Sequence, residues 1–181
     1  MLLRLRIQGF KNLRDVDIRF GPLTCFMGRN GVGKSNIFDA IQFLRLLSER
    51  EIQHAAEDVR SRASGAFGPL DLFSGLDPRS PIRFAADILV PQLVLDDFGE
   101  EATPATNLLS YSIEFRLVRD PLPRLELVEE ELLPLKKGDA RRVLGFPHDR
   151  AFREAAVKGS LRRGPFISTQ RELGKPPQVM L

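Results

Sequence analysis

The sequence predicts an α/β fold in which a mixed sheet leads into a glycine-rich loop and a helix, followed by a layer of antiparallel strands. Three observations carry this prediction. Two N-terminal segments alternate apolar and polar residues with a period of two. A glycine-rich segment then precedes a stretch with helical periodicity. Three strand-like runs follow further along the chain.

The composition indicates one globular core. The chain has 181 residues, of which 43% are hydrophobic and 28% are charged, so neither a disordered nor a membrane-spanning chain is expected. The N-terminus lacks the unbroken apolar stretch of a signal peptide. Cys25 is the single cysteine, which favours a reducing compartment, the cytoplasm. Cys25 lies in an apolar run and is expected in the core.

The first strands are expected at residues 2–8 and 13–20, where apolar and polar residues alternate, with a turn between them. Residues 23–27 are continuously apolar, as in a strand buried on both faces. A helix follows and either runs on to residue 59 or breaks near Ser48. Its expected apolar face comprises Ile37, Ala40, Ile41, Leu44 and Leu47, and its expected polar positions are Asn36, Asp39, Gln42 and Arg45.

The middle of the chain is expected to form strands joined by loops. Ser, Gly and Pro throughout residues 61–81 predict an irregular connection, and residues 96–106 predict an exposed loop. Strands are expected at residues 82–90, 108–118 and 124–133, with a hairpin turn between the last two.

The last part of the chain is basic and weakly patterned. A short helix is expected at residues 150–158, and no strand is expected to close the chain. The predicted organisation is a core at 1–60, a strand subdomain at 61–135 and a basic segment at 136–181. Eleven basic residues against four acidic ones give residues 136–175 a net charge of +7, which suits phosphates, nucleic acid or an acidic partner. The basic residues are Lys136, Lys137, Arg141, Arg142, Arg150, Arg153, Lys158, Arg162, Arg163, Arg171 and Lys175.

Residues 28–35 match the pattern Gly-x-x-x-x-Gly-Lys-Ser, which binds the phosphates of a nucleotide. Glycines allow the backbone to turn successive N–H groups toward the phosphates. Lys34 would meet the β- and γ-phosphates, and Ser35 would offer its hydroxyl to Mg²⁺. The helix N-terminus adds a favourable dipole. The sequence therefore predicts a site for a nucleoside triphosphate with Mg²⁺.

The segments Ile7-Gln-Gly-Phe-Lys-Asn-Leu13 and Gly28-Arg-Asn-Gly-Val-Gly-Lys-Ser-Asn-Ile-Phe-Asp-Ala-Ile41 resemble the N-terminal lobe of ABC-type ATPases of the SMC/RecF/OLD group. The standalone AAA-type ATPases of that group are the most similar. The resemblance covers residues 1–47, and it implies a P-loop NTPase fold whose later strands form an antiparallel β-subdomain.

The resemblance also implies roles for individual residues. Lys11 and Asn12 would approach the nucleotide, the alternative being an ordinary solvated turn. Members of the group hold the metal with a loop glutamine, and Gln92 and Gln170 are the two candidates, each of which has an ordinary surface position as its alternative. The residues expected at the nucleotide are Gly28, Arg29, Asn30, Gly31, Val32, Gly33, Lys34, Ser35 and Asn36, with Lys34 as the catalytic residue and Ser35 at the metal.

Three parts of the group's site are absent from this sequence: a signature segment, an apolar strand ending in Asp-Glu, and a histidine switch. Residues 93–97 superficially resemble such a strand but lack the Glu, and His54 and His148 are poorly placed for a switch. Hydrolysis needs a carboxylate to orient the attacking water, so this chain alone is expected to be inactive. Either the chain is a piece of a longer ATPase or a second polypeptide supplies the rest.

Three hypotheses follow for the function. In the first, the complete protein is an ATPase whose lobes dimerise around ATP, with DNA or a nuclease effector as a partner and with DNA repair, DNA maintenance or phage defence as its role. In the second, the basic segment binds nucleic acid and the nucleotide is only regulatory. In the third, the chain completes another subunit.

Overall fold

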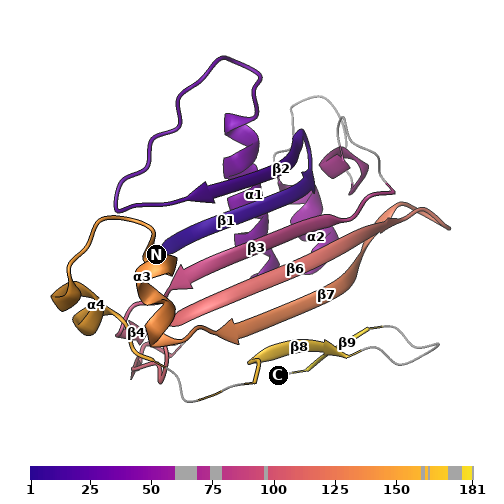
Figure 1. Ribbon diagram of the computed structural model, residues 1–181. Helices are drawn as coiled ribbons and strands as arrows, with labels where there is room; N and C mark the ends of the chain where they lie inside the picture. The colour runs from indigo at the N-terminus through magenta and orange to yellow at the C-terminus, as the bar shows by residue number, and fades with distance from the viewer. Residues whose placement is uncertain are drawn as a thin grey trace.

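The structure is a computed structural model dominated by one twisted sheet (Figure 1). The described residues are 1–59, 69–73, 79–95, 98–159, 162, 164–170 and 177–180. The strands are β1 (Leu2–Phe10), β2 (Leu13–Arg19), β3 (Ile82–Leu89), β4 (Val94–Leu95), β5 (Glu101–Ala102), β6 (Leu108–Val118), β7 (Arg124–Pro134), β8 (Ile167–Gln170) and β9 (Gln178–Met180). The helices are α1 (Lys34–Leu47), α2 (Ile52–Asp58), α3 (Ala140–Leu144) and α4 (Arg150–Ala156), with short 3-10 helices η1 (Pro69–Phe73) and η2 (Lys137–Asp139).

The large sheet has seven strands in the order β2-β1-β3-β6-β7-β8-β9, and β4 pairs with β5 in a separate hairpin. Helices α1 and α2 cover one face of this sheet, while α3 and α4 lie at the end where β1 begins (Figure 1). The described strands pair antiparallel, so the parallel component that a mixed sheet requires does not occur among them. None of the helices in the described residues has the length and apolar character needed to cross a membrane.

The main core lies between the sheet and α1. Alternation along β1 and β3 turns Leu5, Ile7 and Phe84 to this face. Phe43 of α1 packs its ring against Phe84, with 5.9 Å between the ring centroids, and against Phe115 at 5.7 Å. These buried aromatic contacts fix where α1 crosses the sheet.

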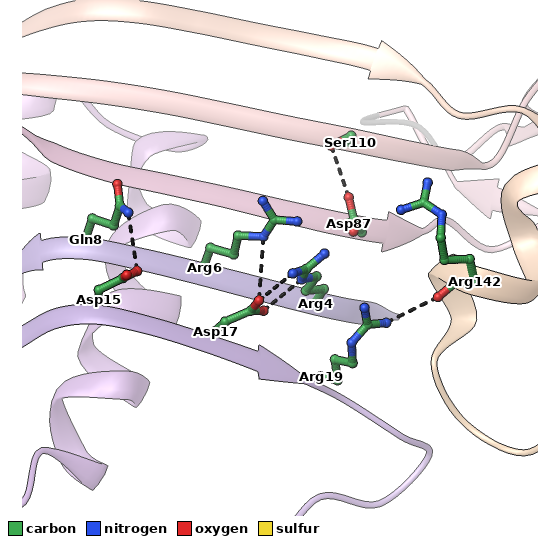
Figure 2. A network of polar contacts seen from close by, with 9 residues as sticks. All are labelled: Arg4, Arg6, Gln8, Asp15, Asp17, Arg19, Asp87, Ser110 and Arg142. Carbon is green, nitrogen blue, oxygen red and sulfur yellow. Dashed lines mark hydrogen bonds and ion pairs between the residues drawn. The ribbon is translucent and has the colours of Figure 1, made fainter.

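The opposite face of the sheet is polar. Figure 2 shows Arg4 of β1 paired with Asp17 of β2, with 2.7 Å between Arg4 Nε and Asp17 Oδ1. The hydrogen bond from Arg4 holds the pKa of the Asp17 carboxyl below its ordinary value. Arg19 donates to the carbonyl of Arg142, 3.2 Å away, and so ties the edge strand β2 to α3. An antiparallel sheet with one apolar and one polar face accounts for the clean alternation in β1 and β2.

The strand predicted at residues 23–27 does not form. The chain from β2 to α1 runs as a long loop (Figure 1), in which Leu23 is 91% exposed and Met27 is 88% exposed. Cys25 is also exposed, so its expected core position is wrong. A strand needs backbone partners beside it, and none of the described strands pairs with this segment. Phe26 is half-buried against the core, with its ring 5.6 Å from that of Phe38.

The predicted helix after the loop is confirmed and breaks at Ser48, where α1 ends before α2 begins. Its predicted apolar face is confirmed in part: Ile37 and Ala40 are buried, and Ile41, Leu44 and Leu47 are half-buried against the core. Phe43 and Leu46 are buried, and Asp39, expected among the solvent-exposed positions, is only 2% exposed. Asp39 is buried because it meets a lysine from the β1–β2 turn, which the helical period alone does not reveal.

The three later strands are confirmed as β3, β6 and β7, and residues 98–106 lie mostly exposed around the β4–β5 hairpin, as expected. The irregular connection at 61–81 falls largely outside the described residues. One expectation for the end of the chain is wrong, because β8 and β9 extend the sheet there. The helix predicted at residues 150–158 is confirmed as α4, and α3 precedes it. Pairing with β7, rather than local propensity, makes β8 a strand.

Candidate phosphate-binding site

Residues 28–33 form a loop that leads directly into α1, exposed at residues 28–32 and buried at Gly33. Gly31 and Gly33 have φ angles of 84° and 104°, which side chains with a Cβ rarely adopt, and Gly28 also has a positive φ. A Cβ on Gly31 would meet nothing within 4 Å, so the backbone conformation alone calls for glycine there. The loop therefore has the conformation that a phosphate-binding turn requires.

The Lys34 side chain folds back over this loop. Its ammonium donates to the carbonyl of Gly28 at 2.6 Å and to that of Arg29 at 2.7 Å. An ammonium has three donors, and these two contacts hold its position above the loop. The arrangement places a positive charge where a phosphate bound in the loop would carry its negative charge.

The N-terminus of α1 adds to this positive potential. Gly33 is the N-cap, it provides no side-chain hydrogen bond, and the first helical turn contains no acidic residue. The first N–H groups of a helix lack intrahelical partners and carry a partial positive charge. Ser35 lies exposed in this turn, where a hydroxyl can reach a cation held by phosphates. These residues fit a triphosphate with Mg²⁺.

The turn between β1 and β2 lies beside the loop. Asn12 donates from Nδ2 to the carbonyl of Gly31, 3.4 Å away, and its Oδ1 accepts from Nδ2 of Asn36 at 2.7 Å. Lys11 behaves differently, because its ammonium lies 2.8 Å from the Asp39 carboxylate and its side chain is 8% exposed. Lys11 is thus not a solvated turn residue, and Asp39 is a partner that sequence patterning missed.

The two glutamine candidates lie away from this loop. Gln92 donates to the carbonyl of Ala155, at the end of the sheet where β3 finishes and β1 starts. Since β1 has nine residues, that end is about 30 Å from the turn that carries Asn12. Gln170 is the last residue of β8, which is the fourth strand from β1 across the sheet. At the usual spacing between strands, β8 is about 19 Å from β1.

The remaining predicted residues are spread around the fold. Residues 94–95 form β4, and residues 96–97 lie outside the described residues. His54 is exposed on α2, whereas His148 packs between the rings of Phe146 and Phe152. Arg163, Arg171 and Lys175 lie outside the described residues. The basic residues from Lys136 to Lys158 lie on or next to η2, α3 and α4, whereas Arg162 lies over the ring of Phe166, before β8.

Some of these basic side chains have acidic neighbours. Arg150 pairs with Glu154 at 2.6 Å, and Arg142 lies 3.6 Å from Asp139. Both are exposed i,i+4 or i,i+3 pairs, which bind their partners weakly. The described part of the basic segment therefore presents solvent-exposed arginines.

Comparison with known proteins gives matches that each cover part of the chain. Residues 4–46 match the family model described as an AAA domain. The chain is 49% identical over 45 residues to the DNA replication and repair protein RecF of Bacteroides thetaiotaomicron, which is 24% of this chain and 12% of that protein. It is 46% identical over 44 residues to the OLD nuclease of Thermus scotoductus, 24% of this chain and 8% of the nuclease.

A longer alignment, to RecF of Phocaeicola vulgatus, has 34% identity over 65 residues, 32% of this chain and 18% of that protein. The chain thus spans less than a fifth of the length of these relatives. One solved structure also matches, and it is described as concerning ATP-driven dimerization and DNA stimulated activation of SMC ATPases. Its sequence is 24% identical, the alignment covers 72% of this chain and 68% of that one, and the TM-score is 0.43.

Proposed function

We propose that residues 4–46 are the N-terminal segment of an ABC-type ATPase of the SMC/RecF/OLD group and that the chain binds ATP with Mg²⁺ at residues 28–36. The observation that carries the proposal is the loop itself. Positive φ angles at its glycines, the Lys34 ammonium held over it and an uncapped helix N-terminus all favour a bound polyphosphate. The cytoplasmic location predicted from the single cysteine belongs to the same proposal.

Each residue has a specific part in this site. The loop backbone from Gly28 to Gly33 would surround the phosphates, and Lys34 would neutralise the β- and γ-phosphate oxygens. Ser35 would orient the cation, which supplies further charge neutralisation when bound. Arg29, Asn30 and Val32 have exposed side chains at the rim, where they can contact the nucleotide or a facing surface.

Hydrolysis would require groups beyond this loop. A carboxylate must orient the water that attacks the γ-phosphate. The relatives are named as replication and repair proteins and as a nuclease. We therefore propose that ATP hydrolysis takes place when a further segment or subunit faces the loop, as in a dimer that closes around ATP. A role in DNA repair, DNA maintenance or phage defence is consistent with the relatives.

Calorimetry with Mg²⁺ and ATP tests the binding proposal. The unmodified chain is expected to release heat on titration, and Lys34→Ala is expected to abolish it while leaving the thermal midpoint unchanged, because Lys34 is exposed enough to be removed without a core defect. Lys136→Ala, which removes an exposed lysine far along the sequence, is the matched control. Undiminished ATP binding by Lys34→Ala would refute the assignment.

A further inference from the structure

One side chain outside the loop contacts both the loop and the helix that follows it. The Asn12 carboxamide donates to Gly31 O, in the middle of the loop, and accepts from Asn36, in the first turn of α1. The donor and the acceptor end of one amide are therefore both used. This pair of contacts links the loop backbone to α1 through a residue of the β1–β2 turn.

The same amide packs against the point where the loop becomes a helix. A Cβ added at Gly33 would lie 2.7 Å from Asn12 Oδ1 and 3.2 Å from Asn12 Nδ2. Gly33 is therefore needed twice, for its left-handed backbone and for the close approach of Asn12. Loop, helix and turn meet here without space for another side chain.

The turn that presents Asn12 is itself fixed. The backbone N–H of Lys11 donates to Leu72 O of η1 at 2.5 Å, and the Lys11 ammonium pairs with Asp39 of α1. On the other side, a Cβ at Gly9 would lie 2.5 Å from the carbonyl oxygen of Pro81. Contacts with η1, α1 and the segment before β3 thus leave Asn12 little freedom to move away from the loop.

We propose that Asn12 is a positioning residue, which holds residues 28–33 in the phosphate-binding conformation before a nucleotide arrives and does not itself bind the nucleotide. This inference rests on the proposed function of the same loop. A loop that is ordered in advance loses less conformational entropy on binding, which raises its affinity for phosphates. Asn36 acts in the same chain of hydrogen bonds, through Asn12.

Binding measurements with two ligands test this role. Because Asn12 acts on the loop, Asn12→Ala is expected to weaken Mg²⁺–ATP and inorganic tripolyphosphate by the same factor, about five- to tenfold for a lost hydrogen bond. Asn36→Ala is expected to give a similar loss, and the double variant no more than Asn12→Ala alone. Gln8→Ala, which removes an exposed amide that donates to Asp15 in the same hairpin, is the control and is expected to bind normally.

Hydrogen exchange in the nucleotide-free protein gives an independent measurement. Amides of residues 28–33 are expected to exchange faster in Asn12→Ala than in the unmodified chain, at an unchanged thermal midpoint. A loss confined to ATP, losses that add in the double variant, or unchanged exchange would each overturn the positioning role. If the unmodified chain binds neither ligand, the proposed function fails, while the exchange measurement still decides whether Asn12 orders the loop.

Discussion

At the scale of single residues, the buried ion pair between Lys11 and Asp39 is the contact with the largest consequence. Both side chains are less than a tenth exposed, and the charged atoms lie 2.8 Å apart. Lys11→Met would leave the Asp39 carboxylate buried without its main counter-charge, which costs about 3–5 kcal/mol of unfolding free energy. Lys11→Met combined with Asp39→Leu is expected to regain most of that loss, because it removes both charges together.

Urea unfolding measures these changes. The control is Arg45→Met, which breaks an exposed i,i+4 pair with Glu49 and is expected to change the unfolding free energy by less than about 1 kcal/mol. A loss for Lys11→Met as small as that for Arg45→Met would contradict the account of the buried pair.

The residue scale also separates what the sequence could predict from what it could not. The glycines and Lys34 of the loop were predictable, because the motif specifies backbone conformation and charge within eight consecutive residues. The partnership of Lys11 with Asp39 was not, because these residues lie 28 positions apart in the sequence. The helical period predicts that Asp39 faces solvent. Asp39 is buried because the β1–β2 turn packs against this side of α1.

At the scale of elements, Asn107 joins three segments at one end of the sheet. Its Nδ2 donates to Val90 O at 3.2 Å and to Ala156 O at 2.7 Å, and its Oδ1 accepts from Lys158 N at 2.8 Å. The side chain is fully buried, at 0% exposure. Because both ends of this amide form hydrogen bonds, Asn107 anchors the segment that follows α4.

Asn107→Ala would leave three backbone groups without this partner, so we expect a loss of about 3 kcal/mol in unfolding free energy. Limited proteolysis is expected to cut first near α4, where the anchoring is lost. Thr106→Ala removes only a 3.3 Å contact to Lys158 O and is expected to cost less than about 1 kcal/mol. Equal losses in the two variants would show that Asn107 is not the anchor.

Elements with a clear period were predicted well, and elements that depend on distant partners were not. Alternation identified β1, β2 and the β6–β7 hairpin, because half-buried strands have a period of two. Residues 23–27 have the apolar composition of a strand but are a loop, because strand formation needs a neighbouring backbone. The reverse holds for β8, whose local sequence pattern is weak but which forms a strand because it pairs with β7.

At the scale of the whole molecule, positive charge gathers at the end of the sheet that carries α3 and α4. Arg141 and Arg142 are exposed there, and the relatives include DNA replication and repair proteins. If this end contacts DNA, each phosphate contact contributes a slope of about −0.9 to the dependence of log affinity on log salt. Replacing both arginines with Gln is expected to reduce the measured slope by about two.

Fluorescence anisotropy with duplex DNA at several salt concentrations gives this slope. Arg45→Gln on α1, an exposed arginine outside the basic segment, is the control and is expected to leave it unchanged. An unchanged slope in the α3 double variant would place the DNA contact elsewhere, and absence of salt-dependent binding would remove DNA from the proposal.

The central claim is that residues 28–36 bind the triphosphate of ATP. Nuclear magnetic resonance of the isotope-labelled chain tests it most directly, by following every backbone amide during titration with Mg²⁺ and ATP. The account predicts that the largest shifts fall in residues 28–36, with those of β6 and β7 almost unchanged. Saturating ATP that leaves the amides of the loop unmoved, or moves mainly residues elsewhere, would contradict it.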